Sequence, residues 1–121
     1  MASKKTLVLG ATPDASRYAY LAANRLVKNG HDIINVGLKN GEVAGVTIEK
    51  PQAIHHDVDT LTLYIGTRNQ PPLYNYILQT KPRRIIFNPG TENAELEQMA
   101  AQQGIETIEA CTLVMLSTGQ Y

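Results

Sequence analysis

With 121 residues, 43% of them hydrophobic and 18% charged, the chain has the length and composition of one compact globular domain, which excludes a disordered or fibrous protein. No apolar run reaches the roughly 20 residues of a membrane-spanning helix, and the lysines near the start precede no apolar signal segment. Eleven basic and eleven acidic residues cancel and are scattered, which argues against nucleic acid as the main partner. We therefore expect a single cytoplasmic domain over residues 1–121 that makes no membrane contact.

An apolar run at residues 6–9 predicts a first strand, which ends at Gly10. Apolar residues at helical spacing then predict a helix from about residue 16 to residue 28. The stripe expected to face the core consists of Tyr18, Leu21, Ala22 and Leu26. Asn29-Gly30 closes this helix, because glycine readily takes the left-handed conformation found at helix ends.

A second strand is predicted over residues 32–36 and is followed by the glycine-rich segment "GLKNGEVAG", which we expect to be a loop. Residues 46–48 are expected to add a short strand or edge segment, and residues 51–56 to form a loop with at most one turn of helix. The clearest strand of the chain is "TLTLYI" at residues 60–65, where leucines and an isoleucine alternate on one face.

The second half of the chain continues this alternation of helices and strands. The segment "GTRNQPP" leads into a helix that ends near residue 80, and its paired prolines suit a first helical turn. A strand at 84–87, a helix at 93–103 and a strand at 106–108 follow, and the tail at 111–116 is expected to be helical and to pack on the sheet. The pattern predicts an α/β fold, a Rossmann-like, doubly wound and mainly parallel sheet with helices on both faces.

Ligands of doubly wound sheets bind beyond the carboxyl ends of the strands, and the first loop at that edge has the composition of an anion site. Gly10 allows a tight turn, the helix that follows presents unpaired N–H groups, and Thr12 and Ser16 carry hydroxyls. Arg17 can bind a phosphate with two parallel hydrogen bonds. The alternative interpretation is a structural turn in which Ser16 caps the helix and Arg17 is solvated.

The first two strands argue against a site for NAD. Only one of the three fingerprint glycines is present, since Thr12 and Ala15 follow Gly10 at the other two positions. No Asp or Glu ends the second strand to hold the ribose hydroxyls. Lys39 lies just beyond that strand, where it suits a ribose phosphate or is an ordinary solvated loop residue.

Two further loops meet at the same edge. "YIGTRN" at residues 64–69 offers a glycine, a hydroxyl and an arginine, or else a helix cap with a surface arginine. "NPGTEN" at residues 88–93 contains Glu92, but it equally suits a turn and a helix cap. No nucleophile or second carboxylate accompanies Glu92, so we expect a binding protein rather than an enzyme.

The cysteine and histidines predict no further chemistry. One cysteine, Cys111, excludes an internal disulfide and a cysteine-rich metal site. No neighbouring basic residue or helix start suggests a reactive thiol, so we expect Cys111 to be a buried small hydrophobe. His31, His55 and His56 lack the companion ligands of a zinc site, so we expect loop or surface positions and no bound metal.

Five segments, in order, resemble the family of small CoA-binding domains that stand alone and are similar to the nucleotide-binding domain of the succinyl-CoA synthetase alpha subunit. They are "GATPDASRYAY", "GEVAGVTIEKP", "TLYIGTR", "NPGTEN" and "EACTL", and the likeness spans residues 5–116. The sequence departs from the family where "VGLKN" replaces a Val-Asn-Pro pattern and "EAC" an Asp-Arg-Cys-like run. The synthetase takes its phosphorylated histidine from elsewhere, so the resemblance implies binding and not ligase chemistry.

The resemblance also implies roles for individual residues. Those that would hold the CoA diphosphate are Gly10, Ala11, Thr12 and Arg17. Val36 and Lys39 would lie along the adenosine and its 3′-phosphate. Those that would line the other side of the crevice are Ile65, Gly66, Thr67 and Arg68, with Pro89 and Gly90 near the exit of the pantetheine. The hypothesis is non-catalytic binding of CoA or an acyl-CoA; the alternatives are an NADP-binding redox or regulatory domain and a ligand-free module that binds a protein partner.

Overall fold

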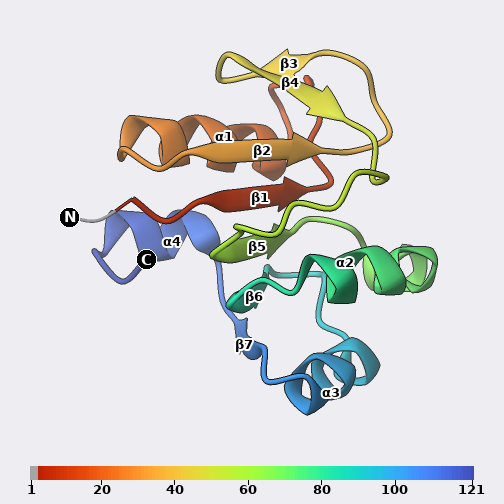
Figure 1. The fold of residues 1–121 in the computed structure, drawn as a ribbon. Coiled ribbons are helices and arrows are strands. Elements are labelled where there is room, and N and C mark those ends of the chain that lie inside the picture. The colour runs from red at the N-terminus through yellow and green to blue at the C-terminus, as the bar shows by residue number, and fades with distance from the viewer. Residues whose placement is uncertain (1–2) are drawn as a thin grey trace.

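The computed structural model describes residues 3–121 and contains one sheet of seven strands. The strands are β1 (Thr6–Leu9), β2 (Ile33–Val36), β3 (Glu42–Val43), β4 (Val46–Glu49), β5 (Thr60–Leu63), β6 (Arg84–Phe87) and β7 (Glu106–Glu109). Their order across the sheet is β3-β4-β2-β1-β5-β6-β7 (Figure 1). All neighbours pair in parallel except β3 and β4, which form an antiparallel hairpin at one edge. The predicted mainly parallel α/β sheet is therefore confirmed.

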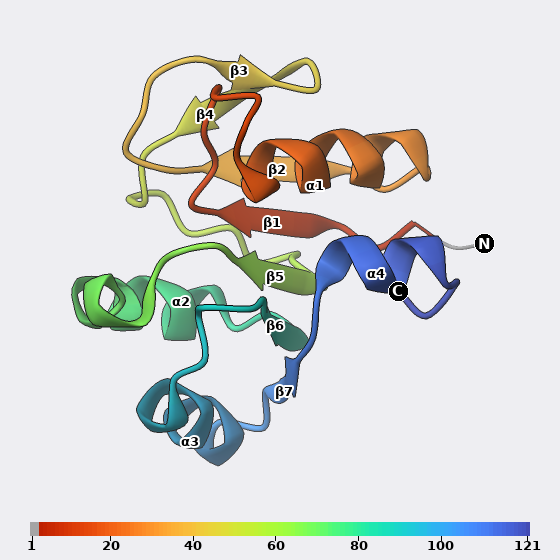
Figure 2. The ribbon, with the colours of Figure 1, turned by 180° about the vertical axis from the view of Figure 1, so that it is seen from behind.

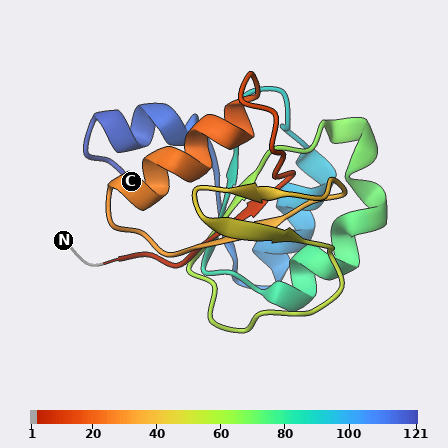
Figure 3. The same cartoon turned by 90° about the horizontal axis from the view of Figure 1, so that it is seen from above.

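Helices cover both faces of the sheet. They are α1 (Tyr18–Lys28), α2 (Tyr74–Thr80), α3 (Ala94–Gln102) and α4 (Thr112–Ser117), with the short 3-10 turns η1 (Thr67–Asn69) and η2 (Pro71–Leu73) before α2. In Figures 2 and 3, α1 and α4 lie on one face and α2 and α3 on the other. The connection from β1 thus runs over one face and that from β5 over the opposite face, so a crevice opens between the carboxyl ends of these two adjacent strands. Within residues 3–121, none of the helices has the length and apolarity that crossing a membrane requires.

Strand alternation divides the core into two layers. Leu7 and Leu9 of β1 pack with the residues of α2 and α3, whereas Val8 packs with those of α1 and α4. Residues 50–59 connect β4 to β5 without a helix and place Val58 in the layer under α2. The expected loop at 51–56 is confirmed, and it contains no helical turn.

The first helix is shorter than predicted, and its predicted buried stripe is right for Ala22 and Leu26 only. It begins at Tyr18 rather than near residue 16, and Tyr18 and Leu21 are 69% and 43% exposed. Ala19 and Ala23 are buried in their place, beside the predicted Ala22 and Leu26. Small side chains let the helix lie close to the sheet, which turns the two larger ones towards solvent.

The loop expected at "GLKNGEVAG" was only partly right, because its end forms strand β3. Asn35, fully buried in β2, donates hydrogen bonds of 3.0 Å to the carbonyls of both Val43 and Val46. One amide side chain thereby holds both strands of the hairpin. The short strand expected at 46–48 is confirmed as β4.

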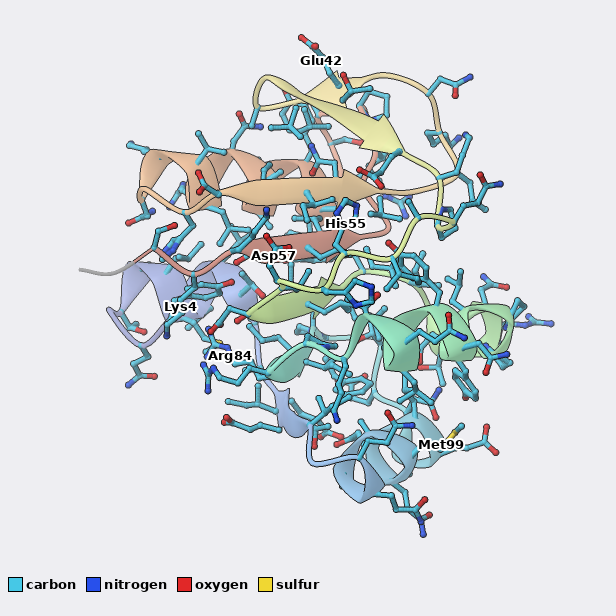
Figure 4. All side chains as sticks on the ribbon, viewed as in Figure 1. Lys4, Glu42, His55, Asp57, Arg84 and Met99 are labelled. Atoms are coloured by element: carbon cyan, nitrogen blue, oxygen red, sulfur yellow. The ribbon has the colours of Figure 1, made fainter. Side chains whose placement is uncertain are left out.

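The amino ends of the parallel strands are closed by a polar cluster around Tyr121. Arg84 is 6% exposed; it donates to the main-chain oxygen of Tyr121 at 2.9 Å and to the hydroxyl of Thr60 at 2.7 Å. Lys4 bonds the same Tyr121 oxygen, and the Tyr121 hydroxyl bonds Thr6. Figure 4 labels Lys4 and Arg84 beside α4. The cluster ties the end of the described chain to the sheet.

His31 belongs to this cluster; the expected loop position is right, but a surface position is wrong. It lies just before β2 and is buried, and its Nδ1 accepts a hydrogen bond of 3.0 Å from the backbone N–H of Lys4. Its ring centroid is 4.9 Å from that of Tyr121. Burial, and then the charges of Lys4 and Arg84, lower the pKa of His31, which favours the neutral ring that accepts this bond.

Cys111 is half-buried rather than fully buried, and a helix does start beside it. The predicted helical tail is confirmed as α4, which packs against α1. Cys111 occupies the residue before its first turn.

Candidate functional site

A cavity of about 900 Å³ opens at the carboxyl ends of β1 and β5, the end of the sheet opposite the two labelled chain ends in Figure 1. Segments that follow β1, β2, β5 and β6 line it, as the sequence predicted. Its size lies within the range of pockets that hold cofactor-sized molecules.

Two glycines let these segments pack closely. A Cβ atom on Gly37 would lie 2.4 Å from the carbonyl oxygen of Ala11, and one on Gly10 would lie 2.8 Å from that of Tyr64. Gly10 also has a φ of +101°, which side chains disfavour. The first loop is therefore held between the loop after β2 and the end of β5.

Several donors of the first loop are already used within the protein. The N–H groups of Gly10 and Ala11 donate to the carbonyl of Val36 at 2.8 and 3.0 Å. The N–H and hydroxyl of Ser16 both donate to Asp14 Oδ1, at 3.0 and 2.7 Å. Ser16 therefore does not cap α1, and an anion at this loop has to be bound by other groups.

The N-terminus of α1 supplies such groups. Arg17 occupies the residue before the helix and its side chain caps nothing. The N–H groups of Tyr18 and Ala19 donate to no protein acceptor in residues 3–121, and both residues line the cavity. The first turn carries no acidic residue. The start of this eleven-residue helix, whose first N–H groups have no acceptor among the described residues, therefore borders the cavity, an arrangement that attracts anions.

Two cations line the cavity beside this helix start. Within the described part of the chain, Arg17 and Lys39 form neither an ion pair nor a side-chain hydrogen bond. Asp14 lies near both. Hydrogen bonds from Ser16 hold the pKa of Asp14 below its ordinary value, and the charges of Arg17 and Lys39 lower it further. Arg17 and Lys39 thus have no bonded partner in residues 3–121, while the carboxylate of Asp14, which also lines the cavity, offsets part of their positive charge.

The opposite wall is mainly apolar. Its lining residues are Tyr64, Ile65, Gly66, Asn69, Pro72, Leu73, Pro89, Gly90 and Thr91. Burial raises the pKa of Tyr64 to about 12, so its phenol is neutral. Glu92 accepts a hydrogen bond from the N–H of Gly90 at 3.0 Å, so its carboxylate caps the turn. This wall suits an uncharged, partly apolar chain better than a phosphate.

The structure brings together most of the predicted site residues. Those that line the cavity are Gly10, Ala11, Thr12, Arg17, Lys39, Ile65, Gly66, Pro89 and Gly90. Val36 is outside it, because strand alternation turns its side chain into the core. Thr67 donates its hydroxyl to the carbonyl of Glu92 at 2.7 Å, and the exposed Arg68 is not part of the lining.

Sequence reasoning missed the buried amides beneath the cavity. Asn88, at the end of β6, donates to the carbonyl of Leu63 at 2.9 Å and to the hydroxyl of Thr62 at 2.8 Å, and accepts from the N–H of Thr112 at 2.9 Å. Gln70 is likewise fully buried. For Asn88 the available signal was a polar residue directly after an apolar strand. The helix cap suggested by "NPGTEN" is confirmed, since Asn93 accepts from the N–H of Leu96 at 3.2 Å.

Comparison with known proteins gives a family and close structural relatives. A family model described as "CoA binding domain" matches residues 4–117. A crystal structure described as an uncharacterized protein is 58% identical, with 100% of both chains covered and a TM-score of 0.97. A hypothetical protein from Pyrococcus horikoshii is 22% identical over 96% of this chain and 83% of its own, with a TM-score of 0.84, and shows the same fold. A Thermus thermophilus structure is 20% identical over 98% and 91%, with a TM-score of 0.77. The comparison with curated proteins gives no match.

Proposed function

The chain belongs to the CoA-binding domain family, and from this premise we propose that the cavity between β1 and β5 binds CoA or an acyl-CoA without performing bond chemistry. The observation that carries the proposal is the uncapped start of α1, where the free N–H groups of Tyr18 and Ala19 meet the unpaired Arg17. The protein would act as a cytoplasmic single-domain binder of this cofactor.

The chemistry of the two walls supports one orientation of the ligand. The diphosphate lies against the start of α1 and Arg17, because these groups supply N–H donors and positive charge. Lys39 reaches the 3′-phosphate beyond the end of β2. The pantetheine arm passes the apolar wall at Ile65 and Pro89.

The family's binding pattern needs one amendment in this chain. Gly10 and Ala11 were expected to hold the diphosphate, but their N–H groups already bond Val36. They contribute by shape instead: a glycine at position 10 lets the loop turn against Tyr64. The N–H groups that donate to the diphosphate are instead those of the first turn of α1.

Calorimetric titration with CoA, 3′-dephospho-CoA and NADPH in one buffer tests the proposal. Charged hydrogen bonds contribute about 1.5–3 kcal/mol each, so three or four of them are consistent with a dissociation constant on the order of micromolar after ordering costs. We expect CoA to bind and loss of the 3′-phosphate to weaken it. Binding of NADPH alone would favour the redox alternative, and binding of none of the three would favour a module for protein partners.

A further inference from the structure

Gln70 lies in the short link between η1 and η2, behind the apolar wall of the cavity, and is 0% exposed. Its Nε2 donates to the carbonyl oxygen of Ile65 at 2.9 Å and to that of Thr91 at 2.8 Å. Ile65 follows β5, and Thr91 follows β6. One buried amide therefore joins the two segments that make this wall.

A second amide fixes the orientation of the first. Asn93 Nδ2 donates to Gln70 Oε1 at 2.7 Å and to the hydroxyl of Tyr74 at 2.8 Å. The Tyr74 hydroxyl in turn donates to Glu95 at 2.9 Å. Both donors and the acceptor of Gln70 are thus used, so its side chain cannot turn without leaving buried polar groups unpaired.

We infer that Gln70 is a positioning residue for the pantetheine arm, holding Ile65 and Gly66 at a set distance from Gly90 and Thr91. The inference rests on the proposed function. Within residues 3–121, the side chain of Gln70 forms no hydrogen bond with the start of α1 or with Lys39, which bind the nucleotide half in that proposal. A substitution that removes the hydrogen bonds of Gln70 should therefore widen the half of the cavity proposed for the pantetheine arm and leave the nucleotide half unchanged.

This separation can be measured with two ligands. Gln70→Met keeps the length of the side chain and removes its donors and acceptor. We expect about tenfold weaker binding of CoA, from loosening of two hydrogen-bonded segments, and unchanged binding of adenosine 3′,5′-bisphosphate, which lacks the pantetheine arm. Gln79→Met, the same change at an exposed position of α2, is the control and should bind both ligands as the wild type does.

A second variant covers the case in which Gln70→Met does not fold. Asn93→Ser retains a cap acceptor for α3 but removes the donor to Gln70, and we expect about threefold weaker CoA binding with the bisphosphate unaffected. Equal weakening of both ligands, or no change in either, would overturn the inference. If the wild type binds neither ligand, the proposed function itself is wrong. That outcome differs from one in which the wild type binds CoA and the variants bind it equally well, which contradicts only the inference about Gln70.

Discussion

The two edges of the sheet carry the same kinds of cationic residue in opposite circumstances. At the amino edge, Arg84 is buried and bonded to Thr60 and Tyr121, and Lys4 bonds the same Tyr121 oxygen. At the carboxyl edge, Arg17 and Lys39 line the cavity, and no acceptor in residues 3–121 bonds them. The cations of the amino edge thus have hydrogen-bond partners within the protein, whereas Arg17 and Lys39 at the carboxyl edge have none in residues 3–121.

This difference separates stability from binding. A buried arginine with its partners in place is destabilising to remove, because the acceptors stay behind unpaired. An exposed arginine without a partner contributes little to folding, yet it can bind a phosphate strongly. Variants at the amino edge should therefore change stability alone, and variants of the exposed cations at the carboxyl edge should change affinity alone.

The largest effect is expected from Arg84→Met at the amino edge. The change leaves the hydroxyl of Thr60 and the main-chain oxygen of Tyr121 with one donor fewer, and we expect a loss of about 2–3 kcal/mol in the free energy of unfolding. Urea unfolding followed by circular dichroism measures it. The folded fraction should bind CoA as the wild type does, and a selective loss of CoA affinity would break the distinction between the edges.

Gly37→Ala tests how tightly the loops of the carboxyl edge pack. The new Cβ atom would lie 2.4 Å from the Ala11 oxygen, so the two loops must separate. We expect a loss of about 2 kcal/mol in stability together with weaker CoA binding. Gly66→Ala is the matched control, since nothing lies within 4 Å of its Cβ position. Equal melting temperatures for the two variants would contradict the close packing.

Arg17→Ala tests whether an unpaired cation of the carboxyl edge contributes to CoA affinity and not to stability. The side chain is exposed and bonds nothing, so stability should stay within about 0.5 kcal/mol of the wild type. We expect CoA to bind about tenfold more weakly, which corresponds to about 1.4 kcal/mol. Calorimetry at two salt concentrations measures this, and the loss should shrink as salt rises. An affinity equal to that of the wild type would remove Arg17 from the site.

The smallest expected effect is a pH dependence of the free energy of unfolding, caused by His31 at the amino edge. The pKa of His31 is lowered in the fold, so the unfolded chain binds this proton more readily. The contribution of the neutral His31 ring to the free energy of unfolding is therefore fully present above the ordinary pKa of 6.5 and falls as pH drops below it. Carboxylates lose their contribution only below about pH 4, so the two effects are separable. His31→Gln, which can still accept from Lys4, should flatten the stability curve between about pH 7 and pH 5; an unchanged slope would contradict the assignment.

The sheet was predictable because its signal is local. The four central strands β1, β2, β5 and β6 are short, fully buried runs rich in apolar residues, and the crossover helices carry apolar residues at helical spacing. The stripe of α1 was misjudged for Tyr18 and Leu21 because periodicity does not reveal how closely a helix approaches the sheet. Strand β3 was missed because two residues carry no period, and its position depends on hydrogen bonds from Asn35.

The site was predictable in outline, since strand ends in a doubly wound sheet meet at one edge. The hydrogen bonds of its first loop were not predictable, because the N–H groups of Gly10 and Ala11 donate to a carbonyl on another strand. Likewise, the family resemblance placed Val36 in the site, whereas its strand turns the side chain into the core. Gln70 lacked any local signal, because its partners lie on two separate segments.

The most direct test of the central claim follows backbone amide signals by NMR while CoA is added to the wild-type protein. If CoA binds at the carboxyl edge, the amide signals of Tyr18, Ala19 and Gly90 shift progressively to saturation. The amide signals of His31 and Arg84 at the amino edge keep their positions. Shifts confined to the amino edge, or no shifts at all, would contradict the central claim.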